Sequence, residues 1–360
     1  IPNPQSPIPN PQSPFNHKIL YNIINTQLFY FILFNLYNML TLKKELNYHS
    51  EGLSHILVLK DGRLSSSSAD NTLIIYNKES FQPDLIIKEH TNYVNYHIQL
   101  ENENIVTCSW DHTLKIIKLL PNYKYEVIQV LKDHTYIVDK ALETKEGKLI
   151  TCANDKLVIV WKKNKDGLFE VEKKIIANKK KYPDSNIVFI KDNLLLCTSV
   201  TDENLKFYEM KNEFQLRFVF HDIKCCFSRN SIIYISKRDL LLVGGVEKNG
   251  IYMFKMKKIP QFIGKYNSIM INEVYSIILL SDGDLLVGAE EVIEAEDEEE
   301  ITENNIYKLK INEDNKGLSL VNKMENAHEE LINGIIDWKE KNSIVTCSKD
   351  KKVKIWTLNK

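Results

Sequence analysis

The chain has 360 residues, of which 43% are hydrophobic and 26% are charged, with 12 Gly and 10 Pro. This composition excludes a disordered, a collagen-like and a disulfide-scaffold protein. The 47 basic residues are balanced by 48 acidic ones, and the net charge of −1 argues against a globally basic nucleic-acid binder, so no specific nucleic-acid partner is expected.

The first 39 residues differ from the rest of the chain. The sequence IPNPQSP occurs twice over residues 1–14, and its proline density excludes a helix or a sheet interior. An uncharged stretch follows from Ile19 to Leu42; as a helix it could cross a bilayer, although Asn and Gln side chains interrupt it on several faces. We expect residues 1–39 to be a disordered leader, an artefact upstream of the first Met, or a membrane segment, and we expect membrane contact only in the last case.

One sequence frame recurs through residues 40–360. In each copy an Asp is followed six positions later by a bulky apolar residue, and a His precedes that Asp by 21 or 22 positions. The clearest copies are SSSADNTLIIY (66–76), VTCSWDHTLKII (106–117), ITCANDKLVIVW (150–161) and VTCSKDKKVKIW (345–356). Alternating apolar runs between turns rich in Asp, Asn and Gly predict four β-strands in each unit.

The spacing of the repeated Asp residues predicts seven units. The steps from Asp70 through Asp111 and Asp155 to Asp202 are 41, 44 and 47 residues. A further 148 residues separate Asp202 from Asp350, which is room for two more units, at 221–255 and 267–310. Only six units are followed by a fourth strand, and the seventh such strand lies at the front of the frame, in residues 40–49. The first strand is therefore predicted to complete the last sheet and to close a ring that has no exposed edges.

From Leu40 to the carboxyl end, this frame resembles the WD-repeat family of β-propellers. The resemblance implies an all-β fold of seven four-stranded blades. In that family the turn Asp accepts hydrogen bonds from the His of the preceding unit, and a strand Ser or Thr and a Trp complete the set. The complete sets implied here are His134, Thr151, Asp155 and Trp161, and His328, Thr346, Asp350 and Trp356. The other repeat residues are His49, Asp70, His90, Asp111 and Asp202.

The repeat also accounts for the pairs of His and Asp that could suggest catalysis. The same arrangement recurs in several units, whereas a nucleophile site is normally unique. The cysteines with repeat spacing are predicted to fill the core; they are Cys108, Cys152 and Cys347. The histidines outside the repeat show no metal-ligand spacing; they are His17, His55, His97 and His112. We therefore expect no catalytic residues, no metal site and no cofactor.

Residues that the fold does not need are the candidates for binding a partner. The insertion Glu290 to Glu303 contains nine acidic residues and falls between the second and third strands of the sixth unit. It is predicted to shield the lysines of the same face, to recruit a basic partner, or to be a solvated loop. Large aromatic residues in turns are typical anchors of interfaces. The candidate partner-binding residues are Tyr93, Trp110, Tyr136, Lys180, Lys349, Glu296, Asp297 and Glu298.

These observations predict a non-catalytic scaffold that binds proteins or peptides and is a subunit of a larger complex. Six Cys without a C-x-x-C pair, and the absence of glycosylation sequons, favour the cytoplasm. One alternative is a substrate-recognition subunit of a ubiquitin ligase, although the Trp-Asp-x-Arg ending of such proteins is absent after Trp161 and Trp356. The other is a propeller-fold enzyme, for which the sequence shows no cluster of His, Glu and Asp outside the repeat.

Overall fold

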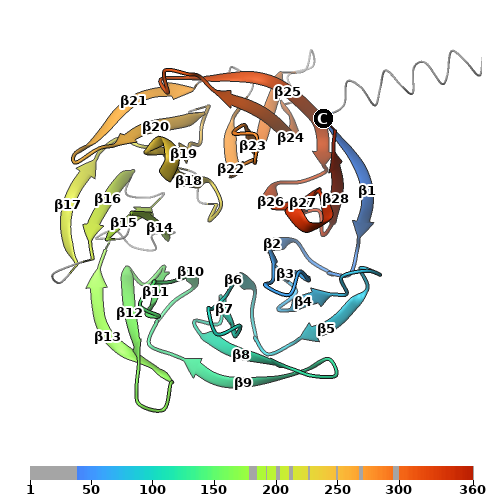
Figure 1. The fold of residues 1–360 in the computed structure, drawn as a ribbon, viewed down its shortest axis with the longest axis vertical. Helices are drawn as coiled ribbons and strands as arrows, with labels where there is room; N and C mark the ends of the chain where they lie inside the picture. The colour runs from blue at the N-terminus through green and yellow to red at the C-terminus, as the bar shows by residue number, and fades with distance from the viewer. Residues whose placement is uncertain are drawn as a thin grey trace, which may run out of the picture.

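The computed structural model describes residues 39–177, 185–191, 193–199, 203–210, 214–225, 228–248, 250–266, 271–294 and 300–359. Their strands form seven antiparallel sheets of four strands each, arranged as blades around a central channel (Figure 1). The predicted all-β fold and the predicted number of blades are therefore confirmed. In the described part of the chain, no helix has both the length and the hydrophobicity that a membrane crossing requires.

The blades follow one another along the chain, and in blades 1 to 6 the first strand lies innermost and the fourth lies at the rim (Figure 1). Blade 1 contains β2 (Leu53–Val58), β3 (Leu64–Ser68), β4 (Leu73–Tyr76) and β5 (Pro83–Ile87). Blade 2 contains β6 (Val94–Gln99), β7 (Ile105–Ser109), β8 (Leu114–Leu120) and β9 (Lys124–Leu131). Blade 3 contains β10 (Val138–Glu143), β11 (Leu149–Ala153), β12 (Leu157–Lys163) and β13 (Phe169–Ile176).

The next three blades have the same order. Blade 4 contains β14 (Ser185–Lys191), β15 (Leu194–Ser199), β16 (Asn204–Glu209) and β17 (Gln215–Phe220). Blade 5 contains β18 (Ile232–Ile235), the 3-10 helix η1 (Ser236–Arg238), β19 (Leu240–Gly244), β20 (Ile251–Met256) and β21 (Pro260–Tyr266). Blade 6 contains β22 (Glu273–Leu279), β23 (Leu285–Glu294), β24 (Glu300–Ile311) and β25 (Leu318–His328).

Blade 7 joins the two ends of the folded region. It contains β26 (Ile332–Trp338), the 3-10 helix η2 (Lys339–Lys341), β27 (Ser343–Ser348), β28 (Val353–Leu358) and, as its outer strand, β1 (Leu40–Leu46). β1 runs antiparallel to β28, from the pair Leu40 and Leu358 to the pair Leu46 and Val353. The predicted closure of the ring by the first strand is confirmed, and it makes blade 7 a four-stranded sheet like the other six. Met39 packs with this strand and is buried, whereas residues 1–38 of the predicted leader lie outside the described residues.

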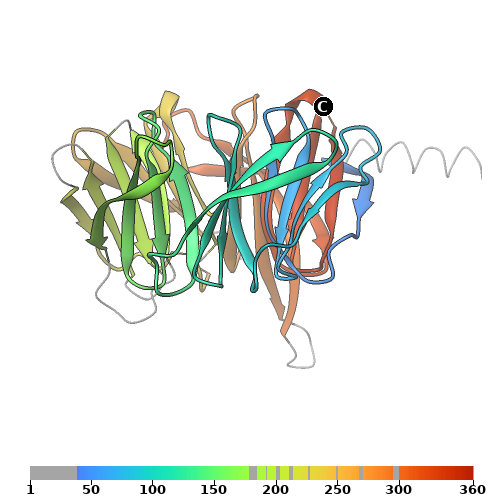
Figure 2. The same ribbon diagram turned by 90° about the horizontal axis from the view of Figure 1, so that it is seen from below.

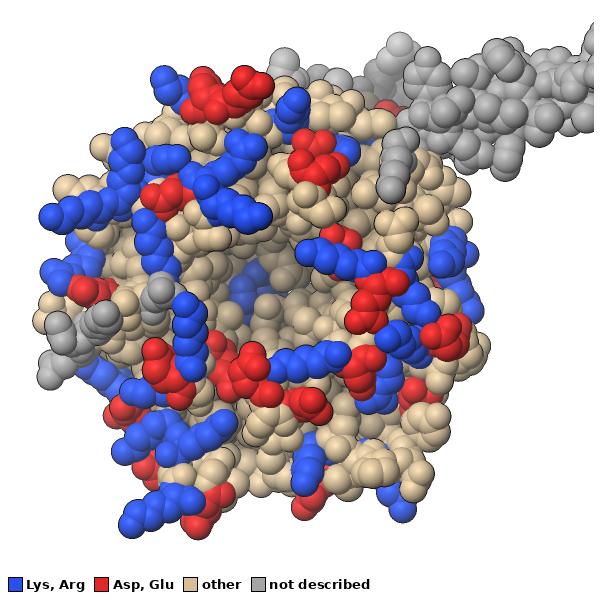
Figure 3. Space-filling model, in the orientation of Figure 1, with Lys and Arg blue, Asp and Glu red and all other residues tan. Residues whose placement is uncertain are grey.

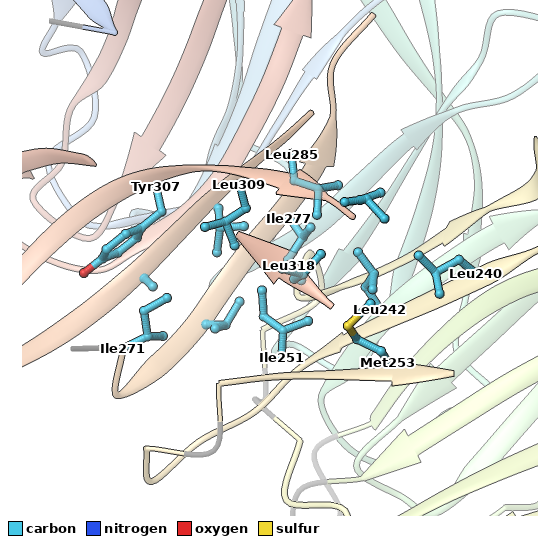
Figure 4. Close-up of a cluster of buried hydrophobic side chains, with 14 of the residues drawn as sticks. Leu240, Leu242, Ile251, Met253, Ile271, Ile277, Leu285, Tyr307, Leu309 and Leu318 are labelled. Atoms are coloured by element: carbon cyan, nitrogen blue, oxygen red, sulfur yellow. The ribbon is translucent and has the colours of Figure 1, made fainter. Parts of the chain in front are cut away.

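Apolar side chains from facing blades interdigitate and form the core. Between blades 5 and 6, for example, Leu242 and Met253 pack with Ile277, Leu285 and Leu309 (Figure 4). Each blade has one apolar face toward each neighbour, so no blade can bury its surface alone and the ring must be complete.

The innermost strands share an irregularity that places polar groups in the channel. In five blades one residue near the start of this strand is skipped in the pairing with the second strand. A β-bulge of this kind turns the side chain of the extra residue away from the sheet. The skipped residues are Ser54, Asn95, Asp139, Tyr275 and Asn333.

The acidic insertion is located in blade 6 between β23 and β24, its second and third strands. Its two ends are not a loop, because Glu290 to Glu294 pair in register with Glu300 to Asn304. The expectation of a solvated loop is therefore wrong for these ends, which extend the two strands as a hairpin beyond the other blades (Figure 2). The predicted binding residues Glu296, Asp297 and Glu298 lie outside the described residues.

Candidate functional site

The turns between the second and third strands of the blades lie on one face of the wheel, which we call the Asp face. In blades 1, 2, 3 and 7 each of these turns begins with an Asp whose Oδ1 accepts the backbone N–H two residues further on, at 3.0 Å. The residue between them has a left-handed backbone in every case, with φ of 71° at Asn71, 70° at His112, 75° at Lys156 and 70° at Lys351. The carboxylate thus stabilises a turn in which a residue other than Gly adopts the unfavourable left-handed conformation.

The other oxygen of each turn carboxylate accepts a hydrogen bond from a His that precedes the blade. The Nδ1–Oδ2 distances are 2.8 Å for His49–Asp70, 2.7 Å for His90–Asp111, 2.8 Å for His134–Asp155 and 2.7 Å for His328–Asp350. The opposite ring nitrogen of each His lies 2.7 or 2.8 Å from a strand hydroxyl. The hydroxyls belong to Ser66, Thr107, Thr151 and Thr346, in the same blade order.

A fourth residue completes the set in three of these blades. Trp161 and Trp356 donate their indole N–H to Thr151 and Thr346, each at 2.9 Å. In blade 1 the Tyr76 hydroxyl lies 2.8 Å from the Ser66 hydroxyl and takes the place of the indole. In blade 2 the corresponding residue is Ile117, which is apolar and buried. The structure thus brings together both sets that the sequence implied, and Asp202 of blade 4 lies outside the described residues.

A hydroxyl, an imidazole and a carboxylate in line also describe a catalytic triad, but this arrangement is unsuited to catalysis. The Thr151 and Thr346 side chains are completely buried, and each hydroxyl oxygen is occupied by an indole N–H. A nucleophile must reach its substrate. The arrangement is instead a hydrogen-bond network that ties the entry of each blade to its second and third strands.

The electrostatics of the turn carboxylates fit this structural use. Burial on its own would raise the pKa of Asp70, but hydrogen bonds from His49, Thr72 and a backbone N–H lower it to about 2. The pKa values of Asp111, Asp155 and Asp350 are lowered in the same way, against the effect of burial, by their His partners and nearby N–H groups. The carboxylates are therefore ionised acceptors at neutral pH.

Blade 6 has a different network in the corresponding region. Glu291 is buried, and its carboxylate accepts hydrogen bonds from Tyr307 at 2.9 Å and from Asn305 at 2.7 Å, and pairs with Lys323 at 2.5 Å. From the sequence, Glu291 belonged to the exposed acidic insertion, and that assignment is wrong for this residue. The sequence does not distinguish Glu291 from the neighbouring acidic residues, because only the strand register shows which side chain points inward.

A second network, which the sequence did not reveal, crosses the channel. Arg229, in the turn before β18 of blade 5, donates from Nη2 to Asp139 Oδ1 of blade 3 at 2.7 Å. Lys140 Nζ donates to Asn186 Oδ1 of blade 4 at 3.0 Å and to the Arg229 carbonyl oxygen at 2.7 Å. Asn95 of blade 2 lies 3.3 Å from the same Asp139 oxygen. The turn that holds Arg229 thus reaches across the channel to a blade that is not its neighbour.

Two buried histidines lie beside this network. His55 of β2 and His97 of β6 face each other with their Nδ1 atoms 3.4 Å apart, and Ser65 Oγ lies 2.9 Å from His97 Nε2. Burial, followed by the charge of His49, lowers the pKa of His97 to about 3. The pKa of His55 lies well below its usual value of 6.5, first because the side chain is buried and then because of the nearby charges of His97, Lys140 and Arg229.

These depressed values predict that the fold weakens in mild acid. The unfolded chain takes up protons on both histidines below pH 6.5 while the folded chain does not, so stability falls as the pH falls. We expect a loss of about 2 kcal/mol attributable to His97 between pH 6.5 and about pH 5, measured by urea unfolding. The variant His97→Asn should show a shallower pH dependence and His112→Asn, at an exposed position, the wild-type one; equal slopes in all three proteins would contradict this assignment.

Where the channel opens on the Asp face, the structure has a pocket of about 570 Å³, which we call the mouth pocket. Turns of blades 1, 2 and 7 form its walls, and the turn of Arg229 forms its inner end. Figure 3 shows the opposite face of the wheel, where the channel is also hollowed at the centre, with a basic side chain deep in the hollow. The lining residues include Glu51, Ser54, Tyr93, Asn95, Trp110, Arg229, Glu330, Asn333, Lys349 and Lys351.

The wall on the blade 2 side is aromatic. Tyr93, in the loop before β6, and Trp110, in the turn after β7, have ring centroids 4.7 Å apart. The same turn carries His112, which stacks on Tyr136 of the next loop with centroids 5.4 Å apart. The side chains of Tyr93 and Tyr136 are 40% and 36% exposed, which leaves their rings accessible to a partner. We call these four residues the aromatic strip.

The predicted binding residues therefore fall into three groups. Tyr93, Trp110 and Lys349 line the mouth pocket, although their positions in the sequence did not show that they converge. Tyr136 lies in the adjacent part of the aromatic strip, outside the pocket lining. Lys180 lies outside the described residues. Two N–H groups of the pocket, Trp110 Nε1 and Arg229 Nε, have no hydrogen-bond partner among the residues that the structure describes.

No arrangement suited to a metal ion occurs among the described His, Cys, Asp and Glu residues. The cysteines of the repeat are buried in the core, and burial raises the pKa of the related Cys197 thiol to about 12. These thiols are therefore protonated and unreactive at neutral pH.

Part of the chain matches the model of a known protein family. The model of the WD domain, G-beta repeat, matches residues 320–357, which span the end of blade 6 and most of blade 7. This region contains Asp350 and Trp356, the best-preserved copy of the repeat frame. A search of curated proteins found no matching sequence.

Proposed function

The chain belongs to the WD-repeat family of β-propellers, a fold typical of protein-interaction scaffolds, and on this basis we propose that it is a non-catalytic platform that binds proteins or peptides on its Asp face. The observation that carries the proposal is the mouth pocket with its aromatic wall. The repeated His and Asp side chains of that face are occupied in holding turns, whereas Tyr93 and Trp110 form no part of the repeated networks.

The chemistry of the pocket favours an extended peptide. Its aromatic wall offers a face to an apolar or cationic side chain, and Glu51, Glu330, Lys349 and Lys351 offer charges of both signs at the opening. A rigid closed wheel presents these groups at fixed separations, which lowers the entropy cost of binding. We propose that the protein is a subunit of a larger, cytoplasmic assembly.

Removing the aromatic wall should abolish this binding without unfolding the protein. We expect Tyr93→Ala/Trp110→Ala to lose at least about 90% of the specifically captured partner, because buried aromatic anchors carry about 2 kcal/mol or more each. The measurement is affinity capture with quantitative mass spectrometry, using the full chain.

The matched control is Tyr123→Ala. Tyr123 is 62% exposed and lies in the same blade, in the turn between β8 and β9 at the other end of these strands. The Tyr123→Ala variant should capture the same set of partners as the wild type. If the two variants lose the same proteins, or if neither loses any while both remain folded, the pocket is not the binding site.

A further inference from the structure

We propose a second binding site, on the face opposite the Asp face, that takes an acidic peptide segment of a partner protein. The site is a groove of about 630 Å³ between blades 4 and 5. Six of its lining residues form what we call the basic groove: Lys191, Glu209, Arg217, Phe218, Lys257 and Lys258.

Strands of blades 4 and 5 bring these residues together. Lys191 ends β14, Arg217 and Phe218 belong to the rim strand β17, and Lys257 and Lys258 follow β20 in the loop to β21. The repeated Asp residues precede the third strands of their blades, whereas Lys257 follows a third strand, so the basic groove opens on the other face of the wheel. In Figure 3, Lys and Arg side chains gather over blade 5.

The charge of the groove is strongly unbalanced for a protein whose net charge is −1. Its lining contains four basic side chains and one acidic side chain, an excess of three positive charges. Glu209 pairs with Arg217, and Asp239 outside the lining pairs with Lys191 at 2.8 Å. Lys257 and Lys258 are exposed and have no acidic partner among the described residues. An excess of this kind, held at one place by closed blades, attracts an anion and favours its encounter.

The donor types distinguish an acidic peptide from a phosphate group. A compact phosphate is best held by a guanidinium fork or by converging backbone N–H groups. The guanidinium of Arg217 is already bonded to Glu209, and the cations that remain are lysines, which act as separate point charges. Phe218 and Leu194 add an apolar surface beside the lysines. Several carboxylates with apolar residues between them, spaced along an extended segment, fit this distribution better than a single phosphate.

The test uses the full chain and a fluorescent ten-residue peptide of alternating Glu and Leu. We expect binding, followed by fluorescence anisotropy, that weakens as NaCl rises from about 50 to about 300 mM. Lys257→Glu/Lys258→Glu should weaken binding at least about tenfold, because both lysines become repulsive. The matched control is Lys162→Glu/Lys163→Glu, at the end of the corresponding strand β12 of blade 3, and should change the affinity by less than about twofold.

Other outcomes would overturn the proposal. No binding of the peptide, or equal losses in the two double variants, would exclude the groove as its site. Binding of inositol hexaphosphate or of phosphatidylserine vesicles that is lost in Lys257→Glu/Lys258→Glu, while the peptide remains bound, would assign the groove to phosphate or lipid instead. If charge reversal disturbs folding, the milder double variant Lys257→Gln/Lys258→Gln replaces it in the same binding measurement. Peptide binding should persist in Tyr93→Ala/Trp110→Ala, so this site and the mouth pocket can fail independently.

Discussion

Replacing Arg229 with methionine should lower the free energy of unfolding by about 3–5 kcal/mol, the usual effect of removing one partner of a buried ion pair. The side chain of Asp139 is only 1% exposed, and Arg229 is its cationic partner. Without the guanidinium, the buried carboxylate loses the hydrogen bond and the positive charge of Arg229. The effect should be visible in urea unfolding followed by tryptophan fluorescence.

The double variant Asp139→Asn/Arg229→Met provides the control. Removing both charges also removes the buried carboxylate that has lost the Arg229 cation, so the double variant should be at least about 1–2 kcal/mol more stable than Arg229→Met alone. A single variant as stable as the wild type, or a double variant less stable than the single one, would show that the contact between blades 3 and 5 contributes little.

The substitution Asp350→Ala should lower the free energy of unfolding by about 2–3 kcal/mol and the melting temperature by several degrees. His328 would lose the acceptor for its Nδ1–H, and the backbone N–H groups of Glu329 and Lys352 would lose theirs. The damage falls on blade 7, where the ring closes, so the pairing of β1 with β28 should loosen first. Calorimetry of the full chain measures the shift.

Asp166→Ala is the matched control, because Asp166 is an exposed Asp in the turn between β12 and β13. It should change stability by no more than about 0.5 kcal/mol. Equal melting temperatures for Asp350→Ala and the wild type would contradict the structural role of the turn carboxylates.

The repeat frame predicted the ring because every unit carries its own copy of the signal. The interval from Asp to the bulky residue six positions on is local, so the blade count and the closure of the last blade by the first strand followed from counting. The hydrogen bond of His134 with Asp155 follows from the other repeated interval, the 21 positions from the His to the Asp. Such features depend on contacts within one unit or between successive units.

The features that the sequence could not reveal depend on contacts between distant units. Asp139 and Arg229 are 90 positions apart, and only the closed ring and the bulge in β10 direct them toward each other. Glu291 reads as one of nine acidic residues until the strand register turns it inward. The convergence of Tyr93, Trp110 and Lys349 at one pocket likewise requires that blades 2 and 7 lie on either side of blade 1 in a closed wheel.

The most direct test compares partner capture per folded molecule in Asp350→Ala with that of the wild type, below the melting temperature of both. If the His and Asp pairs serve only to hold the wheel together, each folded Asp350→Ala molecule should retain at least about half of the wild-type capture despite its lower melting temperature. A variant that melts like the wild type and captures nothing would mean that these pairs are themselves the functional site.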